Sequence, residues 1–245
     1  MLRKITSTSS SSRRLEDNSW RGARTIFFLK FLYILIVVGM VLANISNELP
    51  NHLPPAVKGM DKDTILQLYH IARRIHKLIM ANAVLMFGTI VVSFVMAGVF
   101  FIYWILWLYR AIKNLRCLTK TFFSPVAAVV CSALPGIGYL IGVFILWDIA
   151  RRQQKLLDER GIQYTPVSKR HLVILFVFLL LSSIVLDVEV VLTWSGCFVA
   201  CAVLIVTMLN WQHVLRPCVE QGNMLYQLQQ EVINRAKLEN STPDT

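Results

Sequence analysis

Residues 78–109 read LIMANAVLMFGTIVVSFVMAGVFFIYWILWLY and carry no charged side chain. An α-helix rises about 1.5 Å per residue, so this stretch spans roughly 48 Å as a helix. The hydrocarbon core of a bilayer is only about 30 Å thick. We therefore expect a membrane-spanning helix that tilts or extends beyond the core. The aromatic residues at its end are typical of an interfacial belt: Tyr103, Trp104, Trp107 and Tyr109.

Working outward, four more apolar segments share this character, and the whole chain is poor in charge. Charged residues make up 16% of the 245 residues, against about 25% in a soluble domain. This pattern predicts an all-α, polytopic membrane helix bundle. It has four transmembrane helices, a third apolar segment broken by Pro and Gly, and amphipathic flanking helices. The remaining apolar segments are residues 25–45, 122–149, 172–186 and 190–209.

The regions outside the apolar segments are polar or amphipathic. Residues 1–24 are basic and Ser-rich, and we expect them to be disordered. The membrane domain covers residues 25–209, and residues 64–77 form an amphipathic helix that continues into the second apolar segment. Residues 210–245 form a cytoplasmic amphipathic helix, beginning near Pro217, and a tail. Cleavage as a signal peptide is the alternative for the first apolar segment, which is longer than such peptides usually are.

The third segment, residues 122–149, contains Pro-Gly-Ile-Gly at positions 135–138. A full crossing would place one of the basic clusters at residues 110–120 and 151–170 outside the cell. A re-entrant hairpin places both clusters in the cytoplasm and the acidic turn at Asp187 and Glu189 outside, as the positive-inside rule favours. We prefer the hairpin, with both termini cytoplasmic, and retain a fifth crossing as the alternative.

The basic clusters suggest a partner. They flank the apolar segments, where the positive-inside rule places Lys and Arg. The net charge of +11 is therefore explained by membrane orientation, and we expect no nucleic-acid partner. In the hairpin arrangement they lie at one membrane surface and form a contact for anionic lipid headgroups. The alternative is that they only set orientation. The six side chains are Lys113, Arg116, Lys120, Arg151, Arg152 and Lys155.

No catalytic, cofactor or metal site is predicted. The apolar segments carry almost no charge in their interiors, where catalytic or transport residues would stand out. None of the histidines lies deep in an apolar segment, and neither C-x-x-C nor H-E-x-x-H is present. Small residues offer faces for helix packing or for a partner protein or homodimer. These faces are Gly138 with Gly142, Thr89 with Ser93 and Ala97, and Gly196 with Ala200.

The run WLYRAIKNL at residues 107–115, with Ser124-Pro125 and a later proline, resembles an uncharacterised family of bacterial multi-pass membrane proteins. That family carries the signature W-x-Y-R-a-x-x-N-l, then S-P, then P. The resemblance implies a location in the bacterial inner membrane and no assigned activity. Arg110 and Asn114 are expected to bind carbonyl groups of the hairpin. The signature residues here are Trp107, Tyr109, Arg110, Asn114 and Pro135.

The expected function is a non-enzymatic membrane component that binds or organises a protein or lipid. A channel or carrier for a neutral or lipid-like substrate is the alternative, and a cavity through the bundle would favour it. An enzyme acting on lipid headgroups is a third class, with Asp148, Asp158 and Glu159 as its candidate carboxylates. A carboxylate in a closed pocket beside Arg110 would favour that class.

Overall fold

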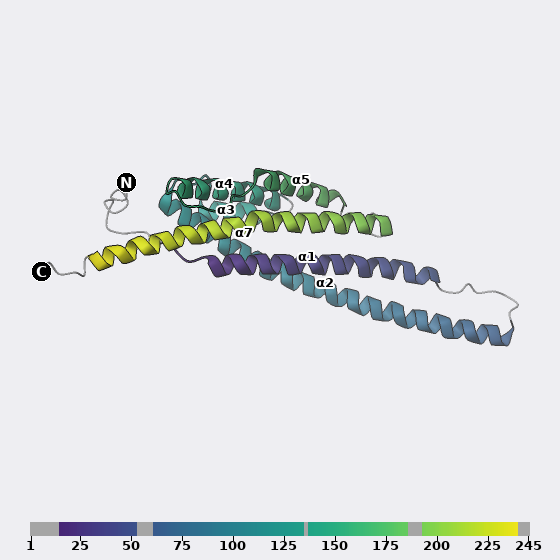
Figure 1. Ribbon diagram of the computed structural model, residues 1–245. Helices are drawn as coiled ribbons and strands as arrows, with labels where there is room; N and C mark the ends of the chain where they lie inside the picture. The colour runs from purple at the N-terminus through teal and green to yellow at the C-terminus, as the bar shows by residue number, and fades with distance from the viewer. Residues whose placement is uncertain (1–14, 53–60, 135–136, 186–192, 240–245) are drawn as a thin grey trace. The chain divides into compact units, whose positions relative to one another are not determined.

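The computed structural model describes residues 15–52, 61–134, 137–185 and 193–239. Within these ranges every regular element is helical, which confirms the all-α part of the predicted fold (Figure 1). The elements are α1 (Ser19–Glu48), the 3-10 helix η2 (Leu49–His52), α2 (Lys62–Leu118), α3 (Pro125–Ser132), α4 (Gly138–Asp158), α5 (Lys169–Val185) and α7 (Trp194–Glu239).

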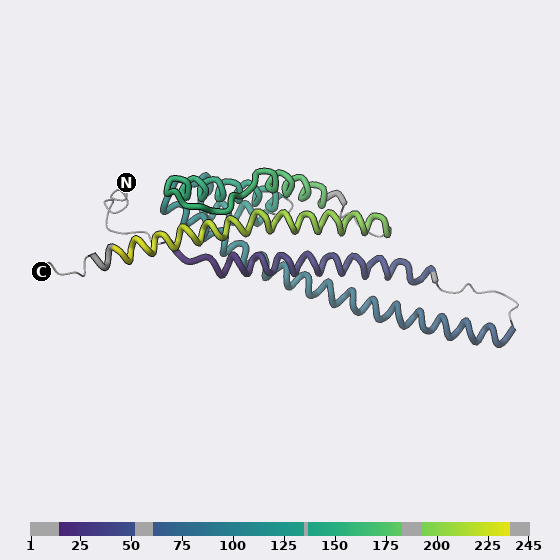
Figure 2. Tube along the Cα trace, in the orientation of Figure 1, coloured from purple at the N-terminus to yellow at the C-terminus, as the bar shows by residue number. Residues whose placement is uncertain are grey.

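Three helical stretches are long and apolar enough to cross a membrane: Ser19–Asn51, Lys62–Leu118 and Trp194–Arg235. The second is α2, which is a single helix of 57 residues, as its unbroken trace in Figure 2 shows. The amphipathic start of α2 therefore does continue into the apolar segment. α5 has 17 residues; the acidic turn predicted after it, at Asp187 and Glu189, lies outside the described residues.

The chain divides into two compact units, and one of them comprises residues 26–102 and 173–212. In this unit Asn82 of α2 donates hydrogen bonds to the carbonyl of Leu42 (2.9 Å) and to Ser46 Oγ (2.6 Å) of α1. Met40 of α1 packs in a buried cluster with Cys197, Ala200 and Leu204 of α7. A buried amide needs hydrogen-bond partners, and lipid cannot supply them. The bonds from Asn82 to α1 therefore favour the pairing of these two helices.

The other unit comprises residues 1–25, 103–172 and 213–245. Its core includes Trp107, Leu115, Ile145 and Leu215, each at most 2% exposed. Trp104 and Trp107 are 6% and 2% exposed, with ring centroids 5.5 Å apart. These two aromatic residues therefore belong to the protein core and not to the predicted interfacial belt, whereas Tyr109 is 39% exposed.

The third apolar segment is interrupted inside this unit, and α3 packs against α4 (Figure 1). Ser124 caps α3 by accepting a hydrogen bond from Ala127 N (3.0 Å), and Pro125 occupies the first turn. α4 starts at Gly138, where a Cβ would lie 2.5 Å from the Ser132 carbonyl oxygen. Only glycine permits this approach, so the break at this position depends on it.

Among the boundaries that differ from the predicted ones are the start of α1 and the start of the C-terminal helix. α1 begins at Ser19, and residues 15–18 are held against α2, so the ordered part of the N-terminal region starts before residue 25. α7 continues through Pro217 instead of restarting there. Pro217 cannot donate to the carbonyl four residues earlier, which weakens a helix. The helix persists because Val214, Leu215 and Cys218 around the proline are fully buried.

Candidate functional site

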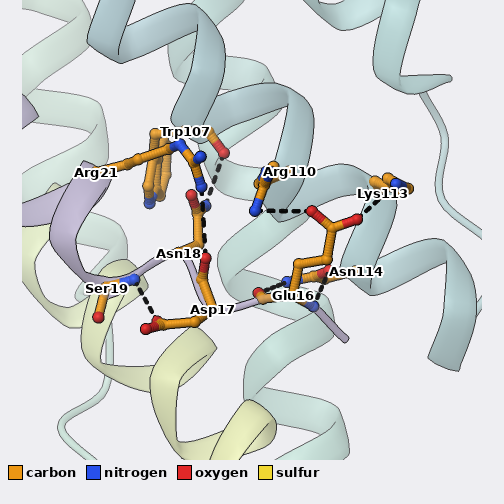
Figure 3. Close-up of polar contacts among 9 residues, drawn as sticks. All are labelled: Glu16, Asp17, Asn18, Ser19, Arg21, Trp107, Arg110, Lys113 and Asn114. Atoms are coloured by element: carbon orange, nitrogen blue, oxygen red, sulfur yellow. Dashed lines mark hydrogen bonds and ion pairs between the residues drawn. The ribbon is translucent and has the colours of Figure 1, made fainter. Parts of the chain in front are cut away.

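In the unit that contains α3 and α4, a short segment without regular secondary structure, residues 15–18, is bonded to α2 and α7, and we call it the strap (Figure 3). Leu15 is 4% exposed, and its backbone N–H donates to Gln229 Oε1 of α7 at 2.6 Å. Asn18 Nδ2 donates to the Trp107 carbonyl of α2 at 2.9 Å. Asp17 Oδ1 accepts from Ser19 N at 2.9 Å, which satisfies the first backbone N–H of α1.

Asn114 binds the strap through its backbone. Its Oδ1 accepts from Glu16 N at 3.0 Å, and its Nδ2 donates to the Glu16 carbonyl at 2.7 Å. Figure 3 shows this amide facing the strap from α2. An amide that satisfies both polar groups of one residue fixes an extended backbone without regard to its side chain.

The Glu16 side chain carries the charge interactions of the site. Its Oε2 lies 2.7 Å from Arg110 Nη1, and its Oε1 lies 2.7 Å from Lys113 Nζ. The hydrogen bond from Lys113 and the charge of Arg110 hold the pKa of this carboxyl below its usual value, against a smaller opposing effect of burial. All three side chains are 33–49% exposed, so the ion pairs are accessible to solvent.

A small cavity of about 20 Å³ lies behind the strap, between α2, α4 and α7. Its lining includes Glu16, Asn18, Gln153 and Gly222. A volume of this size holds about one water molecule. The cavity therefore does not admit a lipid headgroup or a metabolite.

The six predicted lipid contacts have different surroundings. Lys113 is bound to Glu16. Arg152 pairs with Asp148 at 2.7 Å and donates from Nη1 to the Lys120 carbonyl. Lys155 lies 3.9 Å from Glu159, with its side chain 77% exposed. Arg116, Lys120 and Arg151 are exposed. The contact between Arg152 and Lys120 brings the two basic clusters together at one end of the α3–α4 pair.

The α3–α4 pair also exposes large apolar side chains. Phe144 and Trp147 of α4 are 53% and 45% exposed, and Phe122 before α3 is 80% exposed. Phe144, Trp147 and Arg151 follow one another at three- and four-residue steps, so they share a helix face. Lys155 continues this face. One side of α4 therefore changes from apolar to basic along its length.

The signature residues are mostly used to hold the strap. Trp107, Arg110 and Asn114 each contact it, whereas the expectation was that Arg110 and Asn114 bind hairpin carbonyls. Tyr109 is partly exposed, and Pro135 lies outside the described residues. Sequence reasoning missed the strap because its partners are about 90 or more positions away in the chain. The only local sign was Leu15, an apolar residue in a polar region.

Two further arrangements bear on chemistry. The candidate carboxylates have local partners: Asp148 binds Arg152, Asp158 accepts from Tyr164 Oη (2.9 Å), and Glu159 lies near Lys155.

The rings of His171 and His213 stack at 4.8 Å, a contact that the sequence did not suggest. Within the described ranges, no group of three or more His, Cys, Asp or Glu side chains is arranged to hold a metal ion.

Comparison of the chain with protein-family models, with curated proteins and with solved structures yields no match.

Proposed function

We propose that this chain is a non-enzymatic, multi-pass membrane protein that binds anionic lipid headgroups at the cytoplasmic surface through α3 and α4. The observation that carries the proposal is the exposed face of α4, where Phe144 and Trp147 are followed by Arg151 and Lys155. Apolar side chains favour the hydrocarbon region, and Lys and Arg favour the phosphate region above it.

The topology that fits this surface has four crossings, by α1, α2, α5 and α7, and a re-entrant α3–α4 hairpin. α3 has eight residues, which is about 12 Å of helix and too short to span a bilayer. The bond between Arg152 and the Lys120 carbonyl supports placing both basic clusters on the same side. This topology places both termini in the cytoplasm, and the family resemblance is the ground for proposing a bacterial inner membrane.

A lipid-headgroup enzyme has one observation in its favour, because Glu16 lines a cavity and lies beside Arg110. Two facts weigh against it. The cavity, at about 20 Å³, leaves no space for a substrate. The pKa of Glu16 is also shifted downward by Lys113 and Arg110, away from the range in which a carboxylate is an effective general base at neutral pH.

The small-residue faces support packing within the chain more than a partner interface. A Cβ on Gly39 of α1 would lie 3.7 Å from Thr89 of α2, and Ala200 is 1% exposed in its cluster. Close approach of these helices therefore already uses two of the faces. In this proposal a partner protein would bind through the lipid held by this chain and not through the small-residue faces.

The test compares phosphatidylglycerol retained by the purified protein in native mass spectrometry. Arg151→Gln with Lys155→Gln removes two exposed cations from the proposed lipid face, and Arg216→Gln with Arg235→Gln removes two from α7 as the matched control. Each cation near an anionic surface contributes about 1 kcal/mol, so the first pair should lose roughly thirtyfold in lipid affinity. Equal retention by the two variants would contradict the proposal.

A further inference from the structure

The surroundings of Glu16 contain more positive than negative charge. Arg110 and Lys113 each bind one oxygen of its carboxylate. Arg21 of α1 lies close enough to Arg110, Glu16 and Asp17 to interact with their charges. Arg21 and Arg110 repel each other unless an anion lies between them, and Glu16 is the carboxylate bound directly to Arg110.

Arg21 has hydrogen-bonding capacity that the protein does not use. Its Nε is buried and has no acceptor among the described residues, and its Nη1 reaches the Asp17 carbonyl only at 3.5 Å. A guanidinium offers five donors in a fixed plane, which suits a phosphate group better than a single carbonyl oxygen. The contacts of the Glu16 carboxylate are to Arg110 and Lys113, one on each oxygen.

We propose that Arg21, Arg110 and Lys113 form a phosphate-binding site that the Glu16 carboxylate occupies, so that a phosphate group binds by displacing this carboxylate. A phosphate group has enough acceptor oxygens to bridge all three cations. The ligand is the phosphate of an anionic lipid headgroup or free phosphate. The first source rests on the proposed membrane function; the site itself does not.

The exchange does not require the strap to leave. Asn114 binds the backbone N–H and carbonyl of Glu16, independently of the carboxylate. Leu15 remains anchored by burial and by Gln229. The Glu16 side chain, already about one-third exposed, therefore swings outward while the strap stays in place. Exposed ion pairs are weak, which makes them open to competition.

The first experiment measures binding of inorganic phosphate to the full-length protein in detergent by equilibrium dialysis, at constant ionic strength. Glu16→Gln removes the internal competitor and should tighten binding about tenfold. Glu220→Gln is the matched control, because Glu220 pairs with exposed Arg216 (2.9 Å) and carries the same charge. Adding Arg110→Gln and Lys113→Gln to Glu16→Gln should abolish the gain. Equal binding by the Glu16 and Glu220 variants, or a gain that survives loss of both cations, would overturn the site.

The second experiment identifies the source of the phosphate. The same variants are placed in nanodiscs of phosphatidylcholine with and without phosphatidylglycerol, and retained lipid is counted. A gain for Glu16→Gln in phosphatidylglycerol supports a headgroup, and a gain in free phosphate alone supports a soluble ligand. Arg151→Gln with Lys155→Gln should lower lipid retention without changing the tighter phosphate binding of Glu16→Gln. The experiment therefore tests the phosphate site and the lipid-binding face of α4 independently. Hydrogen exchange of residues 15–18 in Glu16→Gln should rise only to the level that the wild-type protein reaches below pH 4.5, because Asn114 and Leu15 still hold the strap. Complete loss of protection would contradict exchange with the strap in place.

Discussion

Asn114 pairs with both backbone polar groups of Glu16, accepting from its N–H at 3.0 Å and donating to its carbonyl at 2.7 Å. This bidentate contact ties residues separated by 98 positions. It also explains why α1 begins at Ser19 and not several residues later. The strap enters α1 already fixed, and Asp17 accepts from the first backbone N–H of the helix.

Replacing Asn114 with alanine should release the strap. Both backbone groups of Glu16 would lose their partners, at a cost of about 1–3 kcal/mol in local stability. Hydrogen–deuterium exchange of residues 15–18 should rise, while α4 remains protected. Asn51→Ala is a suitable control, because the Asn51 side chain is exposed and bonds the exposed Glu48 side chain at 3.4 Å. Unchanged exchange in Asn114→Ala would show that the other contacts, made by Leu15, Glu16 and Asn18, hold the strap without this amide.

The strap should respond to pH only in the acid range. Lys113 and Arg110 lower the pKa of Glu16 from its ordinary 4.5, so the ionised form is favoured in the folded state. The stabilisation is present above the unfolded pKa and is lost as pH falls through the lower folded value. Exchange at residues 15–18 should therefore be constant from pH 8 to pH 5 after correction for intrinsic rates, and increase only below pH 4.5. Glu16→Gln should lack this acid response, and a midpoint above 4.5 would be inconsistent with it.

Gly138→Ala should destabilise the α3–α4 hairpin. The new Cβ would lie 2.5 Å from the Ser132 carbonyl oxygen, so backbone has to move. Overpacking of this kind costs about 1–3 kcal/mol. Gly142→Ala is the control in the same helix, because its Cβ would meet Trp104 at an ordinary 3.7 Å. Thermal unfolding in detergent should separate the two variants, and equal melting temperatures would contradict the close approach.

Asn82→Leu should weaken the pairing of α1 with α2. The substitution removes both hydrogen bonds to α1, and interhelical bonds in membranes are worth roughly 0.6–2 kcal/mol. The readout is disulfide formation between cysteines placed at Gly39 and Thr89 in a background without native cysteines, since these positions are in contact. Crosslinking should slow in Asn82→Leu, whereas Asn51→Ala should leave it unchanged. Equal crosslinking rates would argue against a role for Asn82.

The helical fold could be predicted because a membrane-spanning helix is recognisable from its own local sequence. Residues 78–109 carry no charged side chain, and a helix of this length can be recognised without knowing what packs against it. The break before Gly138 was also visible as Pro and Gly in an apolar run. The strap was not, because Glu16 meets Arg110 and Asn114 only after the chain has folded back. The prediction that Trp107 lies in an interfacial belt was wrong, because a tryptophan at the end of an apolar helix suits a membrane interface as well as a protein core. Only the packing of distant segments distinguishes the two.

The central claim is that α3 and α4 form a hairpin whose basic end faces the cytoplasm, and one labelling experiment tests it most directly. Gly161 has a φ of 67°, which a cysteine would strain, so Gln163, exposed in the same loop, is the better position. Single cysteines at Gln163 and Asp61, in a background without native cysteines, are treated with an impermeant thiol reagent on right-side-out vesicles. The account predicts labelling at Asp61 and none at Gln163 until the membrane is opened. Labelling of Gln163 from the outside would mean that residues 122–149 cross the membrane, and would contradict the hairpin.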